Sequence, residues 1–84
     1  MLKGMSRLFT IKLVSNNKDV LVYDIWDEDR NEYVNQIEVS KKDLSYRLKN
    51  NRKLSNSYEA GAYRVIMEAI RSNVAPEKYS DGWG

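Results

Sequence analysis

The segment 41–53 carries the side chains whose chemistry is easiest to specify from residue type. It holds six cationic side chains against the one carboxylate of Asp43, with a tyrosine among them. Lysine and arginine neutralise phosphates and release counterions, and an aromatic ring can stack on an unpaired base. We therefore predict a surface for nucleic-acid phosphates or a protein partner, formed by Lys41, Lys42, Tyr46, Arg47, Lys49, Arg52 and Lys53. A solvated charged helix without a partner is the alternative.

Two tryptophans predict a second, apolar partner surface. Aromatic side chains are frequent where interfaces concentrate their binding energy. The alternating pattern places Trp26 on the strand face opposite Tyr23, where either a helix covers it or it belongs to an exposed apolar patch. Trp83 stands one residue from the end of the sequence, and its large apolar ring either folds back over the core or is held out for a partner.

The acidic segment 27–38 has part of the spacing of a calcium-binding loop. Oxygen-bearing side chains occupy loop positions 1, 3, 5 and 12, supplied by Asp27, Asp29, Asn31 and Glu38. Glu32, however, stands where such a loop needs glycine for a sharp turn, and the flanking segments have the pattern of strands rather than helices. A hairpin turn rich in polar residues is therefore the alternative, and we expect no bound metal or other cofactor.

The composition excludes most enzymatic chemistry. Among the 84 residues there is no cysteine and no histidine, so thiolate catalysis, disulfides and imidazole bases are ruled out. No nucleophile–base pair and no glycine-rich phosphate loop is visible. We therefore expect a small non-enzymatic interaction protein that binds another macromolecule through an aromatic and basic surface. The alternative is a nucleic-acid-binding accessory protein that uses segment 41–53.

The charge and hydropathy patterns bear on partners and location. A formal net charge of +2 is too small to indicate nucleic acid by itself. No run of about 20 apolar residues is present, so we expect no membrane span and a cytoplasmic location. A core of this size is marginal, and a homodimer would add to its stability. The composition, rich in lysine and asparagine and free of cysteine, resembles that of small proteins of low-GC bacteria and their phages.

The elements that must position these side chains follow from the apolar periodicity. In the first half, apolar residues alternate with period two over 7–14, 20–26 and 33–40, which predicts three strands, the first two joined as a hairpin across the turn 15–19.

The second half has the pattern of two helices. Ser40 and Asp43 resemble a capping box and predict a first helix that ends near Asn50, so the cations of 41–53 would lie on it and on the loop that follows. Asn56 caps a longer second helix whose apolar stripe runs towards Val74 and which Pro76 ends.

The predicted fold class is therefore α+β. We expect one domain over residues 1–84, with a small antiparallel sheet of about three strands in the order β-β-β-α-α, packed against the long C-terminal helix. Residues 1–5 and 75–84 are expected to be flexible or loosely packed termini.

Overall fold

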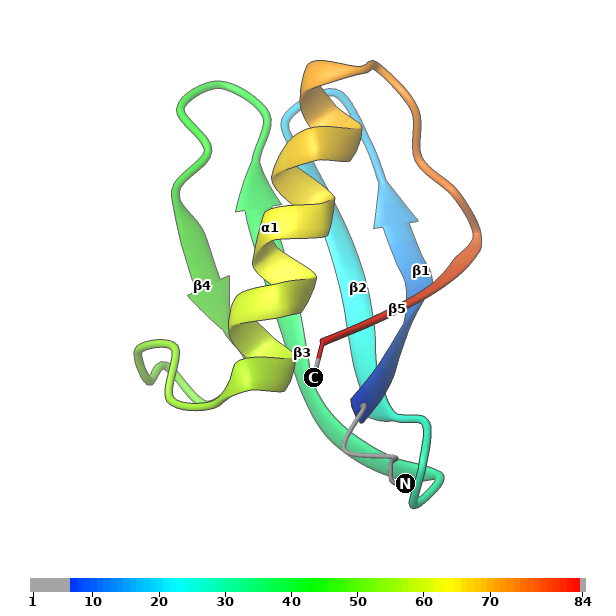
Figure 1. The fold of residues 1–84 in the computed structure, drawn as a ribbon. Helices are drawn as coiled ribbons and strands as arrows, with labels where there is room; N and C mark the ends of the chain where they lie inside the picture. Colours follow the sequence, from blue (N-terminus) through cyan, green and yellow to red (C-terminus); the bar gives the residue numbers. More distant parts are fainter. Residues whose placement is uncertain (1–6, 84) are drawn as a thin grey trace.

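The computed structural model describes residues 7–83, and the side chains of residues 8–82, as one antiparallel sheet and one helix. The elements follow in the order β1 (Arg7–Asn16), β2 (Val20–Asp27), β3 (Glu32–Ser40), β4 (Tyr46–Leu48), α1 (Ser57–Arg71) and β5 (Lys78–Trp83). The strands form a five-stranded sheet in the order β4-β3-β2-β1-β5, and α1 runs across one face of it (Figure 1). In this part of the chain, no helix is long and apolar enough to cross a membrane.

The alternating pattern of the first half is realised as predicted in β1, β2 and β3. One side of each strand packs against α1, and we call this side of the sheet the covered face and the opposite side the open face. Burial of apolar area on the covered face is the main stabilising contribution to the fold. The core consists of Phe9, Ile11, Leu21, Tyr23, Ile25, Ile37, Val39 and Leu48 from the sheet, with Ala62 and Ile66 from α1.

The predicted N-terminal cap of the long helix is confirmed. The Asn56 side chain accepts a hydrogen bond from the Glu59 backbone N–H at 2.8 Å. The buried Glu59 carboxylate accepts in turn from the Ser55 N–H at 2.9 Å and from the Asn35 amide at 3.0 Å, so it joins the cap to β3. The helix ends at Arg71, earlier than predicted, because the chain reverses direction where Asn73 adopts a left-handed conformation with φ 56°.

The predicted first helix is wrong. The Ser40 hydroxyl does accept from the Lys42 N–H, and the Leu44 N–H donates to the Ser40 carbonyl, so one helical turn begins. Leu44 then adopts a left-handed conformation with φ 64°, which ends that turn at once. The chain continues as β4, whose backbone pairs with β3 and whose Tyr46 and Leu48 side chains face the core.

The C-terminal segment is ordered as a strand where we expected a loosely packed tail. Residues 78–83 form β5, which pairs with β1 from Arg7 opposite Trp83 to Lys12 opposite Lys78. The connection from α1 is held where the Tyr23 hydroxyl donates to the Pro76 carbonyl at 2.6 Å. The prediction for residues 1–5 lies outside the described residues.

Gly61 explains how closely α1 can approach the sheet. A Cβ atom at this position would lie 2.8 Å from Cε1 of Phe9, which is closer than real Cβ contacts. Glycine in the helix interior therefore makes room for the buried phenyl ring of β1, at a cost of about 1 kcal/mol in helix propensity. The close partner of this glycine is the sheet.

Candidate functional site

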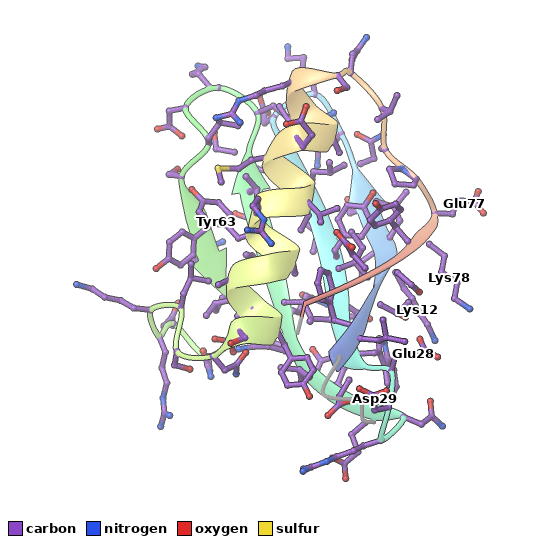
Figure 2. All side chains as sticks on the ribbon, in the orientation of Figure 1. Lys12, Glu28, Asp29, Tyr63, Glu77 and Lys78 are labelled. Carbon is purple, nitrogen blue, oxygen red and sulfur yellow. The ribbon has the colours of Figure 1, made fainter. Side chains whose placement is uncertain are left out.

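The side chains predicted to form a basic surface are divided between the two faces of the sheet. The Tyr46 ring lies on the covered face, with its centroid 4.9 Å from that of Tyr63, and its hydroxyl accepts from the Leu54 N–H at 3.2 Å. Tyr63, on α1, is labelled in Figure 2. Arg47, the next residue, points to the open face, where its guanidinium lies 3.3 Å from the Glu38 carboxylate. The aromatic ring and the arginine of the prediction therefore do not share a surface.

The remaining cations of segment 41–53 lie on a turn and a loop rather than on one helix. Lys41 donates to the Asn16 side chain at 2.6 Å and so joins the turn after β3 to the end of β1. The others are exposed before and after β4: Lys42, Lys49, Arg52 and Lys53. Phosphate binding by these residues stays a prediction, without the common helical face that we expected.

Trp26 lies on the open face, as its place in the alternation predicts. Within residues 7–83 no helix covers that face, so a covering helix is wrong for this side chain. Instead, the Lys12 ammonium lies 4.7 Å from the Trp26 ring centroid, and the Tyr33 ring packs edge-on at 5.6 Å. The Trp83 backbone ends β5 opposite Arg7, and the Trp83 side chain lies outside the described residues.

Tyr33 also engages an acidic neighbour on the open face. Burial, the negative charge of Asp24 and a hydrogen bond to Asp24 together raise the pKa of the Tyr33 hydroxyl. Asp24 accepts a second hydrogen bond from the Gln36 amide at 2.9 Å. The centre of the open face is therefore a cluster of polar and aromatic side chains that carries carboxylates as well as cations, and in it the buried Trp26 Nε1 has no hydrogen-bond partner among the described residues.

The carboxylates of the calcium-like segment do not converge. Burial would raise the pKa of Asp27, but hydrogen bonds from Tyr58 and the Arg30 backbone, with the Arg30 charge, hold that pKa below its usual value. Asp29 instead accepts from the Leu8 N–H at 3.1 Å, and Glu38 lies with Arg47. Over residues 7–83, no group of three or more potential metal-binding side chains is present.

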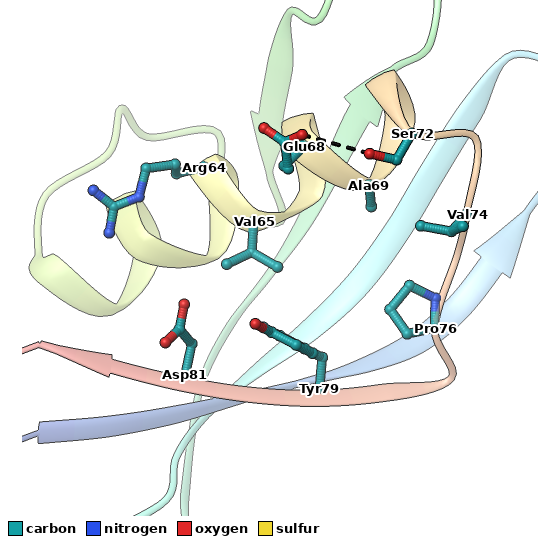
Figure 3. A pocket seen from close by; sticks show the side chains of 9 residues that line it. All are labelled: Arg64, Val65, Glu68, Ala69, Ser72, Val74, Pro76, Tyr79 and Asp81. Carbon is teal, nitrogen blue, oxygen red and sulfur yellow. Dashed lines mark hydrogen bonds between the residues drawn. The ribbon is translucent and has the colours of Figure 1, made fainter.

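A groove of about 370 Å³ lies between α1 and β5, and we call it the α1–β5 groove. Figure 3 shows side chains from the helix and from the strand facing each other across it. Its apolar lining comes from Val65, Ala69, Val74, Pro76 and Tyr79, and its polar rim from Arg64, Glu68, Ser72 and Asp81. Val74 is 56% exposed and Tyr79 43% exposed, so the groove leaves two large apolar side chains in contact with solvent.

The groove continues towards the N-terminal end of α1. A second hollow of about 250 Å³ shares Arg64 with the first and is otherwise lined by Ser57, Ala60 and Gly61. These small side chains keep the helix surface low along this stretch. The two hollows together follow most of the length of α1, a shape that suits an extended chain.

The backbone of β5 presents unpaired hydrogen-bonding groups beside this groove. The Leu13 N–H donates to the Glu77 carbonyl at 2.8 Å, which fixes the phase of the ladder between β1 and β5. Odd-numbered residues of β5 therefore bond to β1, while the N–H and C=O groups of Lys78 and Ser80 point outward. No hydrogen bond joins these outward groups to the described residues. Among the outward groups of β5 in the described residues, the Gly82 N–H differs, because it donates a hydrogen bond to the Asp81 side chain at 2.8 Å.

Sequence reasoning missed this site because it assigned residues 75–84 to a loosely packed terminus. Two signals for an edge strand were present, namely Lys78 and Gly82 beside the exposed Tyr79. Neither signal specifies a partner strand, so the groove could not be derived from them. Comparison of the chain with protein-family models, with curated proteins and with solved structures finds no match.

Proposed function

We propose that this protein is a non-enzymatic interaction module that binds an extended segment of a partner protein by adding it to the sheet as a strand beside β5. The observation that carries the proposal is the row of outward backbone groups at Lys78 and Ser80, directly beside the α1–β5 groove. Peptide recognition by strand addition uses these two features together, since main-chain bonds supply affinity and alternate side chains enter a neighbouring pocket.

The dimensions of the groove fit this mode of binding. On a strand, side chains that point to the same face recur about every 6.6–6.8 Å. One side chain of the added strand would therefore reach the apolar hollow near Tyr79, and the next on the same face would lie near Arg64 and Asp81. A cavity of about 370 Å³ accommodates a large apolar side chain with room to spare.

A proline substitution tests the proposal at the edge itself. Ser80→Pro removes the outward N–H, and edge strands tolerate proline where the N–H faces solvent. Ser80→Ala is the matched control, because both variants lose the contact between the Ser80 and Thr10 hydroxyls but only the proline variant loses the N–H. Peptides selected from a displayed library of random ten-residue sequences on the wild-type protein are titrated against both variants, with thermal melts to verify folding.

We expect Ser80→Pro to weaken peptide binding at least tenfold and Ser80→Ala to change it less than threefold. Equal binding to the folded proline variant, or enrichment of no peptide at all, would overturn the proposal.

Nucleic-acid binding through segment 41–53 leads to a different expectation. Phosphate contacts weaken steeply with salt, whereas main-chain pairing and an apolar groove respond little. Under our proposal, a Lys41→Glu and Lys42→Glu double variant binds the selected peptides with unchanged affinity, because neither lysine lies near the groove. An affinity that falls with salt and with this double variant would instead support the nucleic-acid alternative.

A further inference from the structure

Two lysines lie directly opposite each other where β5 meets β1. The strand register pairs Lys12 with Lys78, and Figure 2 shows both side chains on the β5 side of the molecule. Within residues 7–83, no carboxylate oxygen lies within 4 Å of either ammonium group. Like charges directly opposite on neighbouring strands are destabilising, so this pair is a local imbalance in the sheet.

Two acidic side chains lie nearby on the same face, and both already accept hydrogen bonds. Asp24 lies opposite Lys12 on β2 and accepts from the Gln36 amide at 2.9 Å. Glu28 folds over the open face, where its carboxylate accepts a hydrogen bond from the Thr10 hydroxyl. Lys12 has the Trp26 ring beneath its ammonium, whereas Lys78 lies on the free edge strand with its other flank open. A strand added to β5 would place one side chain directly across from Lys78.

We infer that the partner segment carries an acidic side chain opposite Lys78, and beside it in sequence a large apolar side chain that enters the α1–β5 groove. This inference rests on the proposed function and specifies its ligand. Side chains opposite each other on paired strands point to the same face, so the residue across from Lys78 lies on the open face. Its neighbour in the added strand points to the other face, next to Tyr79 and the apolar lining.

The charges on the two sides of β5 favour a peptide whose acidic side chain lies on the open face and whose apolar side chain enters the groove, rather than the opposite arrangement. The open-face side carries the cations Lys12 and Lys78, which attract a carboxylate. The groove side carries two carboxylates on its rim, Glu68 and Asp81, against the one cation Arg64, so the charge of the rim is net negative. An acidic residue is therefore favoured on the open-face side and disfavoured in the groove. This preference determines which face of the added strand points to the groove.

A second copy of this chain does not provide the required residue. On the open face β5 presents Lys78, Ser80 and Gly82, so β5 of a second molecule has no carboxylate to place opposite Lys78. Pairing between two β5 strands would leave the lysine imbalance in place. A dimer formed by pairing two β5 strands would therefore not supply the acidic residue that we infer.

A charge exchange tests the inference. The probes are two end-blocked ten-residue peptides of alternating leucine and threonine, identical except that one central threonine is replaced by glutamate in the first and by lysine in the second. We expect wild-type protein to bind the glutamate peptide roughly threefold to tenfold more tightly than the lysine peptide, and Lys78→Glu to reverse the order. Lys18→Glu, in the turn between β1 and β2, is the control and should leave the order unchanged.

The outcomes separate the inference from the function on which it rests. If both peptides bind with one affinity to wild type and to Lys78→Glu, while Ser80→Pro abolishes binding, the acidic specificity is wrong and strand addition stands. If binding of either peptide is indifferent to Ser80→Pro, strand addition itself is wrong. If neither peptide binds and sedimentation shows a dimer that Ser80→Pro dissociates, a second copy occupies the edge and the inference is overturned.

Discussion

The two edges of the sheet are built differently, although each belongs to a strand that pairs with one neighbour. At one edge, β4 has three residues, and the outward carbonyl of Leu48 accepts a hydrogen bond from the Asn51 N–H at 2.9 Å. At the other edge, β5 has six residues, and the outward groups of Lys78 and Ser80 have no such partner within residues 7–83. Short strands and covering loops are the usual protection of a sheet edge. The β4 edge has both, and this difference is the reason why we propose β5 as the edge that a partner would use.

The two edge strands are also attached to the core in different ways. β4 contributes the buried Leu48, and near it the Tyr63 hydroxyl donates to the Leu44 carbonyl. β5 contributes no fully buried side chain among residues 78–82 and lies beside the buried side of β1, where Phe9 and Ile11 belong to the core. Side-chain burial therefore attaches β4, whereas backbone pairing with β1 attaches β5.

The largest expected effect comes from removing the core beneath β5. Phe9 is 1% exposed and packs against Gly61 of α1, so Phe9→Ala should lower the free energy of unfolding by about 3–5 kcal/mol. Urea unfolding followed by circular dichroism measures this. Leu8→Ala is the control, because Leu8 is 42% exposed on the open face and should cost less than about 1 kcal/mol. Similar losses in the two variants would contradict the assignment of faces.

A smaller loss is expected from the side chain that attaches β4. Leu48 is 1% exposed, and Leu48→Ala should cost about 2–4 kcal/mol. Native-state hydrogen exchange should show reduced protection of the bond from the Lys49 N–H to Gln36, while the Leu13 N–H keeps its protection. Arg47→Ala, at the neighbouring exposed position, is the control. Equal loss of protection at both edges would show that the edges are not attached independently.

The smallest effect concerns the hydrogen bond that holds the entry to β5. Tyr23→Phe removes the bond from the Tyr23 hydroxyl to the Pro76 carbonyl and should cost about 1 kcal/mol. Burial raises the pKa of the Tyr23 hydroxyl, so the bond should persist over the neutral pH range. Tyr33→Phe is the control for removal of a tyrosine hydroxyl, because Tyr33 lies on the open face away from β5. If Tyr23→Phe leaves both stability and binding of the selected peptides unchanged, this bond does not position the β5 edge.

Much of the sheet could be predicted because its signals are local. The alternation over 7–14, 20–26 and 33–40 places apolar side chains on one face of a strand wherever that strand pairs, and this pattern appears as β1, β2 and β3. The cap formed by Asn56 and Glu59 likewise needs only residues three apart.

The candidate site could not be predicted in the same way. Ser40 and Asp43 favour a helix locally, but burial of Leu48 and pairing with β3 determine the conformation of β4. The contact between Thr10 and Ser80 joins residues 70 positions apart, and no pattern within residues 78–83 predicts it. Tyr46 and Arg47 lie on opposite faces because this segment is the strand β4 and not a helix. The groove exists because β5 pairs with β1 beside α1.

By itself, the sequence determined which segments have a buried side, where the long helix begins, and that cysteine and histidine chemistry are absent. The tertiary structure decided which strands form the two edges, which outward backbone groups of β5 lack a partner within residues 7–83, and that a groove lies between β5 and α1. The reason is physical: side-chain periodicity is a property of one segment, whereas an edge and a groove exist only after distant segments have paired and packed.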